Sequence, residues 1–325
     1  MHIADRPATG SRPYTRASAF IRERKKVNLA AERIKYITAV VLYGTIGMFL
    51  RYVRLPSETA ALCRGIFGSL FILAFLKAGG RKPDREAIRA NLKWLIVGGV
   101  SLGLNWIFLF AAYIQTTVAI ASLCNYLAPL IVILIAPAVL GERSDWRKLL
   151  CVAAAFCGIV LVSGAWNGSV GNPSGVIMGL SAALCFVVIV ISNRKLSGIS
   201  AYDKSFVQLG ISALTILPYA VVKNLGTPLE PDVRSVLIVL MLGILHTGAA
   251  YCLYFSGMGS LPVQTVAILG YLEPVVSVLC SAFFLREPMG AAGWIGAALI
   301  IGAAVVSETM KTDNGKKTAD GTGRS

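Results

Sequence analysis

Charged residues are scarce in this sequence. Asp, Glu, Lys and Arg make up 14% of its 325 residues, whereas apolar residues make up 56%. A soluble domain carries about 25% charged residues, so a surface that faces water throughout is excluded. The apolar residues fall in runs of about 17–25, the length with which a helix crosses roughly 30 Å of hydrocarbon. The composition therefore predicts an integral membrane protein.

The sequence also lacks the motifs of several functional classes. It has no G-x4-G-K-[ST] loop, which argues against an ATP-driven pump, and no H-E-x-x-H motif. With only two histidines, a hydrolase embedded in the membrane lacks its catalytic constellation. The seven cysteines show no C-x-x-C spacing, and residues 1–33 contain no apolar segment of a signal peptide. We therefore expect no enzymatic activity, metal site, cofactor or cleaved leader.

Ten apolar segments lie between charged residues or Gly and Pro. The predicted helices cover residues 36–53, 57–76, 92–111, 116–140, 147–165, 174–193, 204–222, 234–257, 263–285 and 290–308. Of the 31 basic residues, 25 lie in the tails 1–35 and 309–325 and in alternate connections, and five lie in the other connections. The positive-inside rule then places both termini in the cytoplasm of a cell-membrane protein. The basic N-terminal tail is expected to rest on anionic lipid rather than to bind nucleic acid.

The chain matches itself at a shift of 145 residues. The segment 125–143 aligns with the segment 270–288 without a gap, and six of nineteen positions are identical. This predicts two copies of one five-helix unit, at 36–165 and 174–308. Because five is odd, the second copy is inserted upside down. Inverted repeats are typical of secondary transporters, whose substrate site lies between the halves.

The repeated residues resemble the EamA-type permeases of the drug/metabolite transporter superfamily. The motif reads Leu127-x-Pro129 and Leu140-Gly141-Glu142-Arg143 in the first copy, and Leu272-Glu273-Pro274 and Leu285-Arg286-Glu287-Pro288 in the second; Arg64 in the second predicted helix adds to the likeness. The resemblance implies ten helices around a central cavity. It implies secondary transport of small organic metabolites, such as amino acids or related amines, by alternating access. Export is favoured, proton coupling is one option, and a passive facilitator is the alternative.

Glu273 is the only acidic residue deep inside a predicted span. A charge there costs about 2.5–3.5 kcal/mol on insertion scales, and the repeat places Ala128 at the equivalent position. The fold therefore does not require this carboxylate. Three accounts remain open: an ion pair with Arg64, binding of a cationic substrate, or proton coupling, since burial favours the protonated form of a carboxyl.

Other residues complete the list of candidates. His246 is the second deep titratable group, either a packing residue or a ligand for protons or substrate. Polar and aromatic residues at similar depth are candidate walls of a substrate cavity: Asn105, Trp106, Asn125, Tyr126 and Tyr271, together with Tyr43 and Tyr251. We expect a small-molecule substrate and membrane lipid as partners; the oligomeric state is left open.

Two further pairs recur in both copies of the repeat. Pro129 and Pro274 are predicted to bend their helices, either to line a cavity or only to shape the packing. Glu142 and Glu287 stand at predicted helix C-termini, where the helix dipole disfavours a carboxylate. Each glutamate should therefore have a basic partner and act as a structural clasp or as a gate.

Overall fold

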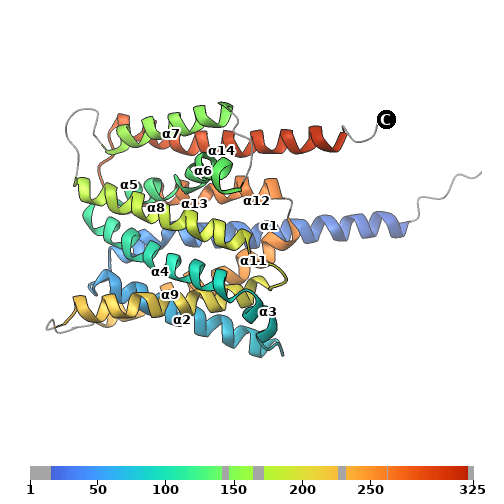
Figure 1. The fold of residues 1–325 in the computed structure, drawn as a ribbon, viewed down its shortest axis with the longest axis horizontal. Coiled ribbons are helices and arrows are strands. Elements are labelled where there is room, and N and C mark those ends of the chain that lie inside the picture. The colour runs from blue at the N-terminus through green and yellow to red at the C-terminus, as the bar shows by residue number, and fades with distance from the viewer. Residues whose placement is uncertain (1–15, 141–145, 164–171, 226–231, 262, 321–325) are drawn as a thin grey trace, which may run out of the picture.

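The computed structural model describes residues 16–140, 146–163, 172–225, 232–261 and 263–320, and all elements of this part are helices (Figure 1). The first half comprises α1 (Arg16–Leu50), α2 (Ser57–Ala78), α3 (Arg85–Ala90), α4 (Leu92–Gln115), α5 (Val118–Asn125), α6 (Ala128–Leu140) and α7 (Trp146–Ser163). The second half comprises α8 (Pro173–Arg194), α9 (Ala201–Lys223), α10 (Val233–Gly243), the π-helix η2 (Ile244–Ala249), α11 (Ala250–Ser260), α12 (Val263–Gly270), α13 (Leu272–Leu279), the π-helix η3 (Cys280–Phe284) and α14 (Ala291–Asp320).

Six helices in the described part are long and apolar enough to cross a membrane. They are Leu29–Leu50, Ser57–Ala78, Leu92–Gln115, Pro173–Arg194, Ala201–Lys223 and Val233–Gly257. Four shorter apolar helices, at Val118–Val132, Leu149–Ser163, Leu272–Phe284 and Ala291–Ser307, lie where the other four spans are predicted. The protein is thus an all-helical, multi-pass membrane protein, and the count of ten spans stays a prediction.

Two of the predicted spans are interrupted near their middle. The segment 116–140 divides into α5 and α6 at Tyr126–Leu127, and the segment 263–285 divides into α12 and α13 at Tyr271. Pro129 and Pro274 lie in the first turn after each break, where a proline costs little because the first N–H groups of a helix have no partner within it. The two copies of the repeat therefore share an interruption at the same place.

The outer helices extend beyond their predicted ends. α1 begins at Arg16, within the segment predicted as a tail, and α14 continues to Asp320. The added stretch of α1 is rich in Ala, Glu, Lys and Arg, which are strong helix formers. Hydropathy detects only the apolar part of such a helix, so the predicted start of α1 is too late and the predicted end of α14 is too early.

Small residues bring the helices close together. α7 packs along α14, where Gly158 and Gly296 face one another: a Cβ on either would lie 2.6–2.7 Å from the carbonyl oxygen of the other. α4 packs against α8 and α9, and α2 packs against α9 and η2. Such contacts are characteristic of helices in lipid, where van der Waals fit drives association.

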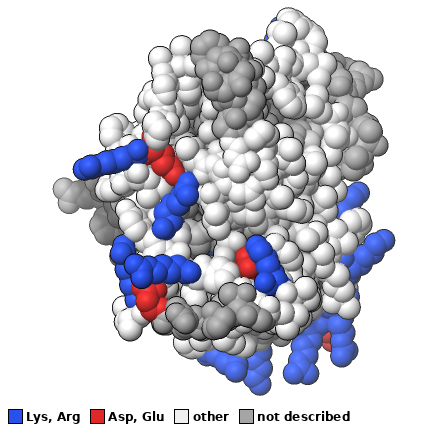
Figure 2. All heavy atoms as spheres, turned by 90° about the vertical axis from the view of Figure 1, so that its left-hand side faces the viewer, with Lys and Arg blue, Asp and Glu red and all other residues white. Residues whose placement is uncertain are grey.

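The two ends of the helix bundle differ. α1 and α14 both project from the end on the right of Figure 1. Figure 2 views the opposite end, where the few charged side chains include basic groups directly beside acidic ones. Among the described residues, two ion pairs lie at this end, Arg51–Glu287 at 2.6 Å and Lys223–Glu58 at 3.2 Å. We refer to it below as the paired end.

Candidate functional site

Arg64 occupies the middle of the bundle on α2. Its side chain is 6% exposed, and its guanidinium carbon lies 4.2 Å from the centre of the Trp106 ring on α4. Its Nε donates a 2.7 Å hydrogen bond to Oγ1 of Thr247 in η2. Thr247 in turn donates to the carbonyl oxygen of Leu242, five residues earlier, at 2.8 Å. The guanidinium of Arg64 is therefore fixed at its Nε edge by the hydrogen bond to Thr247 and on one face by the ring of Trp106.

The π-helix η2 is fitted closely to α2. Gly68 leaves room for Thr247, because a Cβ at Gly68 would lie 2.6 Å from Cγ2 of that threonine. Gly243 and Gly248 leave room for the side chains of Phe67 and Phe71 in the same way. π-helical turns occur frequently at functional sites, and this one carries both Thr247 and His246.

Glu273 lies in the first turn of α13, partly exposed, among tyrosines. Tyr126, at the break between α5 and α6, forms a side-chain hydrogen bond with it. Further hydroxyl groups lie within electrostatic range of Glu273, namely those of Tyr36, Tyr43, Tyr113, Tyr251 and Tyr254. α1 reaches α13 because Gly44 packs against the carbonyl group of Glu273. We call Arg64, Trp106, Tyr126, Thr247 and Glu273 the central cluster.

Arg64 and Glu273 attract one another without direct contact. Each lies within electrostatic range of the other, but no nitrogen of Arg64 comes within 4 Å of a carboxylate oxygen of any described acidic residue. In this conformation Arg64 and Glu273 therefore lie in the central cluster as separate groups and do not form an ion pair.

A polar stripe runs from Glu273 toward the paired end. Ser277 and Ser281 follow Glu273 at intervals of four residues, so all three lie on one face of α13 and η3. Ser277 shares a 2.6 Å hydrogen bond with Ser122 of α5, and Ser281 donates to Glu287 at 2.5 Å. This face thus links the central cluster to the ion pair at the paired end.

Glu287 joins three elements at the paired end. It accepts hydrogen bonds from Arg51 at the end of α1, at 2.6 Å, and from the backbone N–H of Val118 at the start of α5, at 2.8 Å, besides the one from Ser281. Its carboxylate thus meets the positive N-terminus of a helix rather than a negative C-terminus. We call Glu287, Arg51, Val118 and Ser281 the clasp. Glu142, its predicted counterpart, lies outside the described residues.

Three candidate residues make packing contacts outside the central cluster. Asn105 donates to Asn125 at 3.0 Å and to the carbonyl oxygen of Ala182 at 2.8 Å, which ties α4 to α5 and α8. The hydroxyl of Tyr271 donates to the carbonyl oxygen of Ala304 at 3.2 Å and so points toward α14.

His246 lies in the wall beside the cluster. It is 1% exposed, its Nε2 lies 3.1 Å from Oγ1 of Thr45, and its ring packs edge-on against Phe49. Sequence reasoning missed its neighbour Thr247. Nothing in the local sequence marks this threonine, because its role depends on the π-helical turn and on Gly68 of another helix.

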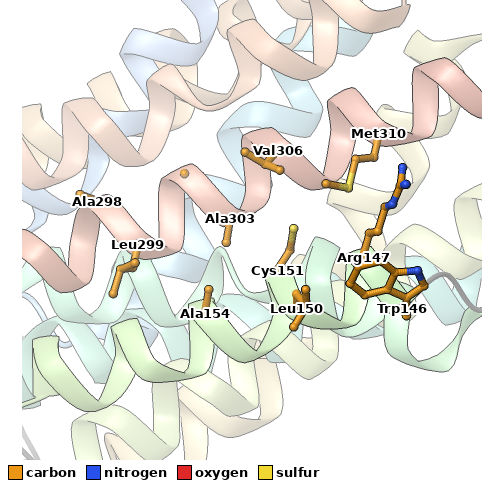
Figure 3. Close-up of a pocket in the computed structure, with 11 residues that line it drawn as sticks. Trp146, Arg147, Leu150, Cys151, Ala154, Ala298, Leu299, Ala303, Val306 and Met310 are labelled. Carbon is orange, nitrogen blue, oxygen red and sulfur yellow. The ribbon is translucent and has the colours of Figure 1, made fainter.

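A groove between α7 and α14 is a separate feature. It measures about 510 Å³, and all of its lining residues except Arg147 are apolar. Figure 3 shows Trp146 and Arg147 near Met310 at one end, with small residues such as Ala154 and Ala303 along it. None of its lining residues belongs to the central cluster, so we do not assign the site there.

The fit between α2 and η2 gives a testable expectation. Gly68→Ala should lower the free energy of unfolding by about 1–3 kcal/mol, the usual cost of overpacking, because the new methyl group overlaps Thr247. Gly302→Ala is the matched control, since a Cβ there meets no atom within 4 Å. Thermal unfolding of the two purified variants should therefore separate them by several degrees. Equal melting temperatures would contradict the close fit.

The similarity to known proteins extends over nearly the whole chain. The model of the EamA-like transporter family matches twice, at residues 34–164 and 173–309. "Uncharacterized transporter YxxF" of Bacillus subtilis is 26% identical over 89% of this chain and 93% of its own length. "Aromatic amino acid exporter YddG" of Ancylobacter novellus is 30% identical over 84% of this chain and 95% of its own.

A solved crystal structure shares the fold. It superposes with a TM-score of 0.62 at 23% sequence identity, and the match covers 86% of this chain and 98% of that one. The apolar helices together with two copies of a transporter domain define a membrane transporter. The chain belongs to the EamA-like transporter family.

Proposed function

We propose that the protein is a secondary transporter of small organic metabolites, such as amino acids or related amines, with export as the favoured direction. The observation that carries this proposal is the central cluster, in which a partly exposed carboxyl group and a buried guanidinium lie within electrostatic range of one another in a transporter fold. A relative named as an aromatic amino acid exporter supports the substrate class.

The proposed mechanism is alternating access between two inverted five-helix halves. The breaks before Pro129 and Pro274 would let α5 and α6, and likewise α12 and α13, move as separate segments. The clasp joins α1, α5 and η3 at the paired end, which supports a state closed at that end. Transport then requires the clasp to open, so Glu287 acts as a gate residue rather than only as a structural one.

Flux measurements in proteoliposomes test the function. The purified protein should move members of a metabolite library across the bilayer, and accumulation should depend on an imposed pH gradient. Flux without such dependence would indicate the passive facilitator instead. The absence of flux for every library member, in vesicles that contain folded protein, would contradict transport.

Topology provides an independent expectation. The excess of basic residues on one side predicts that both termini face the cytoplasm of a cell membrane. A fluorescent protein fused after Ser325 should therefore mature, and an alkaline phosphatase at the same position should stay inactive. The opposite pattern would overturn the predicted arrangement of ten spans.

A further inference from the structure

Arg64 has unused hydrogen-bonding capacity in the middle of the bundle. A guanidinium has five N–H donors, and the only described acceptor for them is Thr247, which takes the Nε hydrogen. No described residue accepts from the two terminal Nη groups, and no described carboxylate lies within 4 Å of them. The side chain is nevertheless more than nine-tenths buried.

A buried cation without an anion is costly. Stacking of a desolvated cation on an aromatic ring is favourable, but its contribution is smaller than the desolvation cost of one charge. The contact with Trp106 therefore offsets only part of the penalty. An anion that completes the hydrogen bonds of Arg64 would offset much of the rest.

The surroundings of Arg64 fix the kind of anion that fits. The hydroxyl of Thr247 already donates to Leu242, so it can only accept from Nε, and this blocks the Nε edge of the guanidinium. Trp106 covers one face. The two Nη groups have no acceptor among the described residues, and their parallel N–H donors in one plane match the two oxygens of a carboxylate.

Glu273 supplies the opposite charge nearby. Arg64 and Glu273 lie within electrostatic range of each other. A ligand with only an ammonium group that approaches Glu273 would therefore also be repelled by Arg64. A ligand that also carries a carboxylate removes this conflict. The cluster therefore suits a zwitterion better than a plain amine.

We propose that Arg64 is the receptor for the carboxylate of the transported substrate, with Thr247 as its positioning residue, so that the protein carries amino acids and not the amines derived from them. This inference rests on the proposed transport function and narrows its substrate class. The flat ring of Trp106 would lie beside the bound carboxylate, and the ammonium group would lie toward Glu273.

Matched ligand pairs test the proposal on the unmodified protein. The probes are L-tryptophan, L-phenylalanine and L-leucine, each beside its decarboxylated amine and its methyl ester. At least one amino acid should raise the melting temperature of the purified protein, because a ligand that binds only the folded state stabilises it. Its amine and its ester, which lack the negative charge, should give no shift at the same concentration.

Variants then assign the carboxylate to Arg64. Arg64→Lys keeps the charge but loses the planar pair of donors, and it should weaken binding of the amino acid at least tenfold. Thr247→Val keeps the shape and frees Nε, and it should weaken the same ligand while leaving the unliganded melting temperature within a few degrees. Arg85→Lys, on the exposed helix α3, is the control and should bind as the unmodified protein does.

Several results would overturn the inference. One is stabilisation by the amines or esters that equals stabilisation by the amino acids. Another is unchanged affinity in Arg64→Lys, and a third is the absence of a shift with every amino acid while chloride or sulfate alone stabilises the protein. Flux of amines without amino acids would overturn this assignment and leave the transporter function standing, whereas absence of all flux would overturn that function itself.

Discussion

Replacing Glu273 with glutamine is expected to abolish the accumulation of substrate driven by a pH gradient, while exchange of substrate across the bilayer continues. Partial removal of a carboxyl from water favours its protonated form, and the partly exposed Glu273 lies among tyrosines with no basic group within 4 Å in the described residues. The glutamine keeps the shape and the hydrogen bond with Tyr126 but cannot titrate. Proton and substrate could then no longer alternate at one site.

The measurement compares accumulation ratios in proteoliposomes with and without the gradient. The ratio in Glu273→Gln should fall to the value found without a gradient. Glu32→Gln is the matched control, because Glu32 pairs with Lys35 within α1 and lies outside the central cluster. Accumulation by Glu273→Gln that still follows the gradient would reject proton coupling at this residue, and loss of both binding and exchange would favour a direct substrate role.

His246 provides a companion test of the same idea. Its contacts with Thr45 and Phe49 are those of a packed wall residue. His246→Gln should therefore retain gradient-driven accumulation, although the protein should be less stable because a buried ring is lost. Loss of coupling at normal folded yield would instead make His246 part of the proton pathway.

Replacing Glu287 with alanine is expected to open the paired end. The change removes three hydrogen bonds to one carboxylate. It leaves the N–H of Val118 without its acceptor, and Arg51 keeps only the carbonyl oxygen of Thr116. Hydrogen bonds to a charged group contribute about 1.5–3 kcal/mol each. Because Arg51 is partly exposed, the solvent replaces some of this, and we expect a net loss of about 2–4 kcal/mol for the closed state.

Thiol labelling reports this opening. Cys280 is 5% exposed and lies next to Ser281, so it should become reactive toward a membrane-impermeant reagent only when the clasp opens. Lys223→Met is the control, since it breaks the other ion pair at this end without touching the clasp. Protection of Cys280 in Glu287→Ala equal to that in the unmodified protein would show that the clasp does not hold this end closed.

The membrane class and the family could be predicted from the sequence because apolar segments and short repeated motifs are visible in it without knowledge of the tertiary contacts. The transfer of each apolar segment into lipid is favourable independently of its neighbours, so hydropathy locates the apolar helices. The repeat at a shift of 145 residues singled out Pro129 and Pro274, which lie in the first turn after each helix break, and the cost of a carboxylate inside a predicted span singled out Glu273. The lengths of α1 and α14 were underestimated because hydropathy does not detect their polar ends.

The partners of these residues were decided only by the tertiary structure. Glu287 pairs with Arg51, 236 residues away, and not with a basic neighbour in sequence. Arg64 is positioned by Thr247, which reaches it through a π-helical turn and the space left by Gly68. Between apolar helices the surrounding lipid is as apolar as the contact itself, so lateral packing depends on the fit of small residues and not on hydropathy. Such fit has no periodic signature in a single sequence, and so the central cluster emerges only once the helices are side by side.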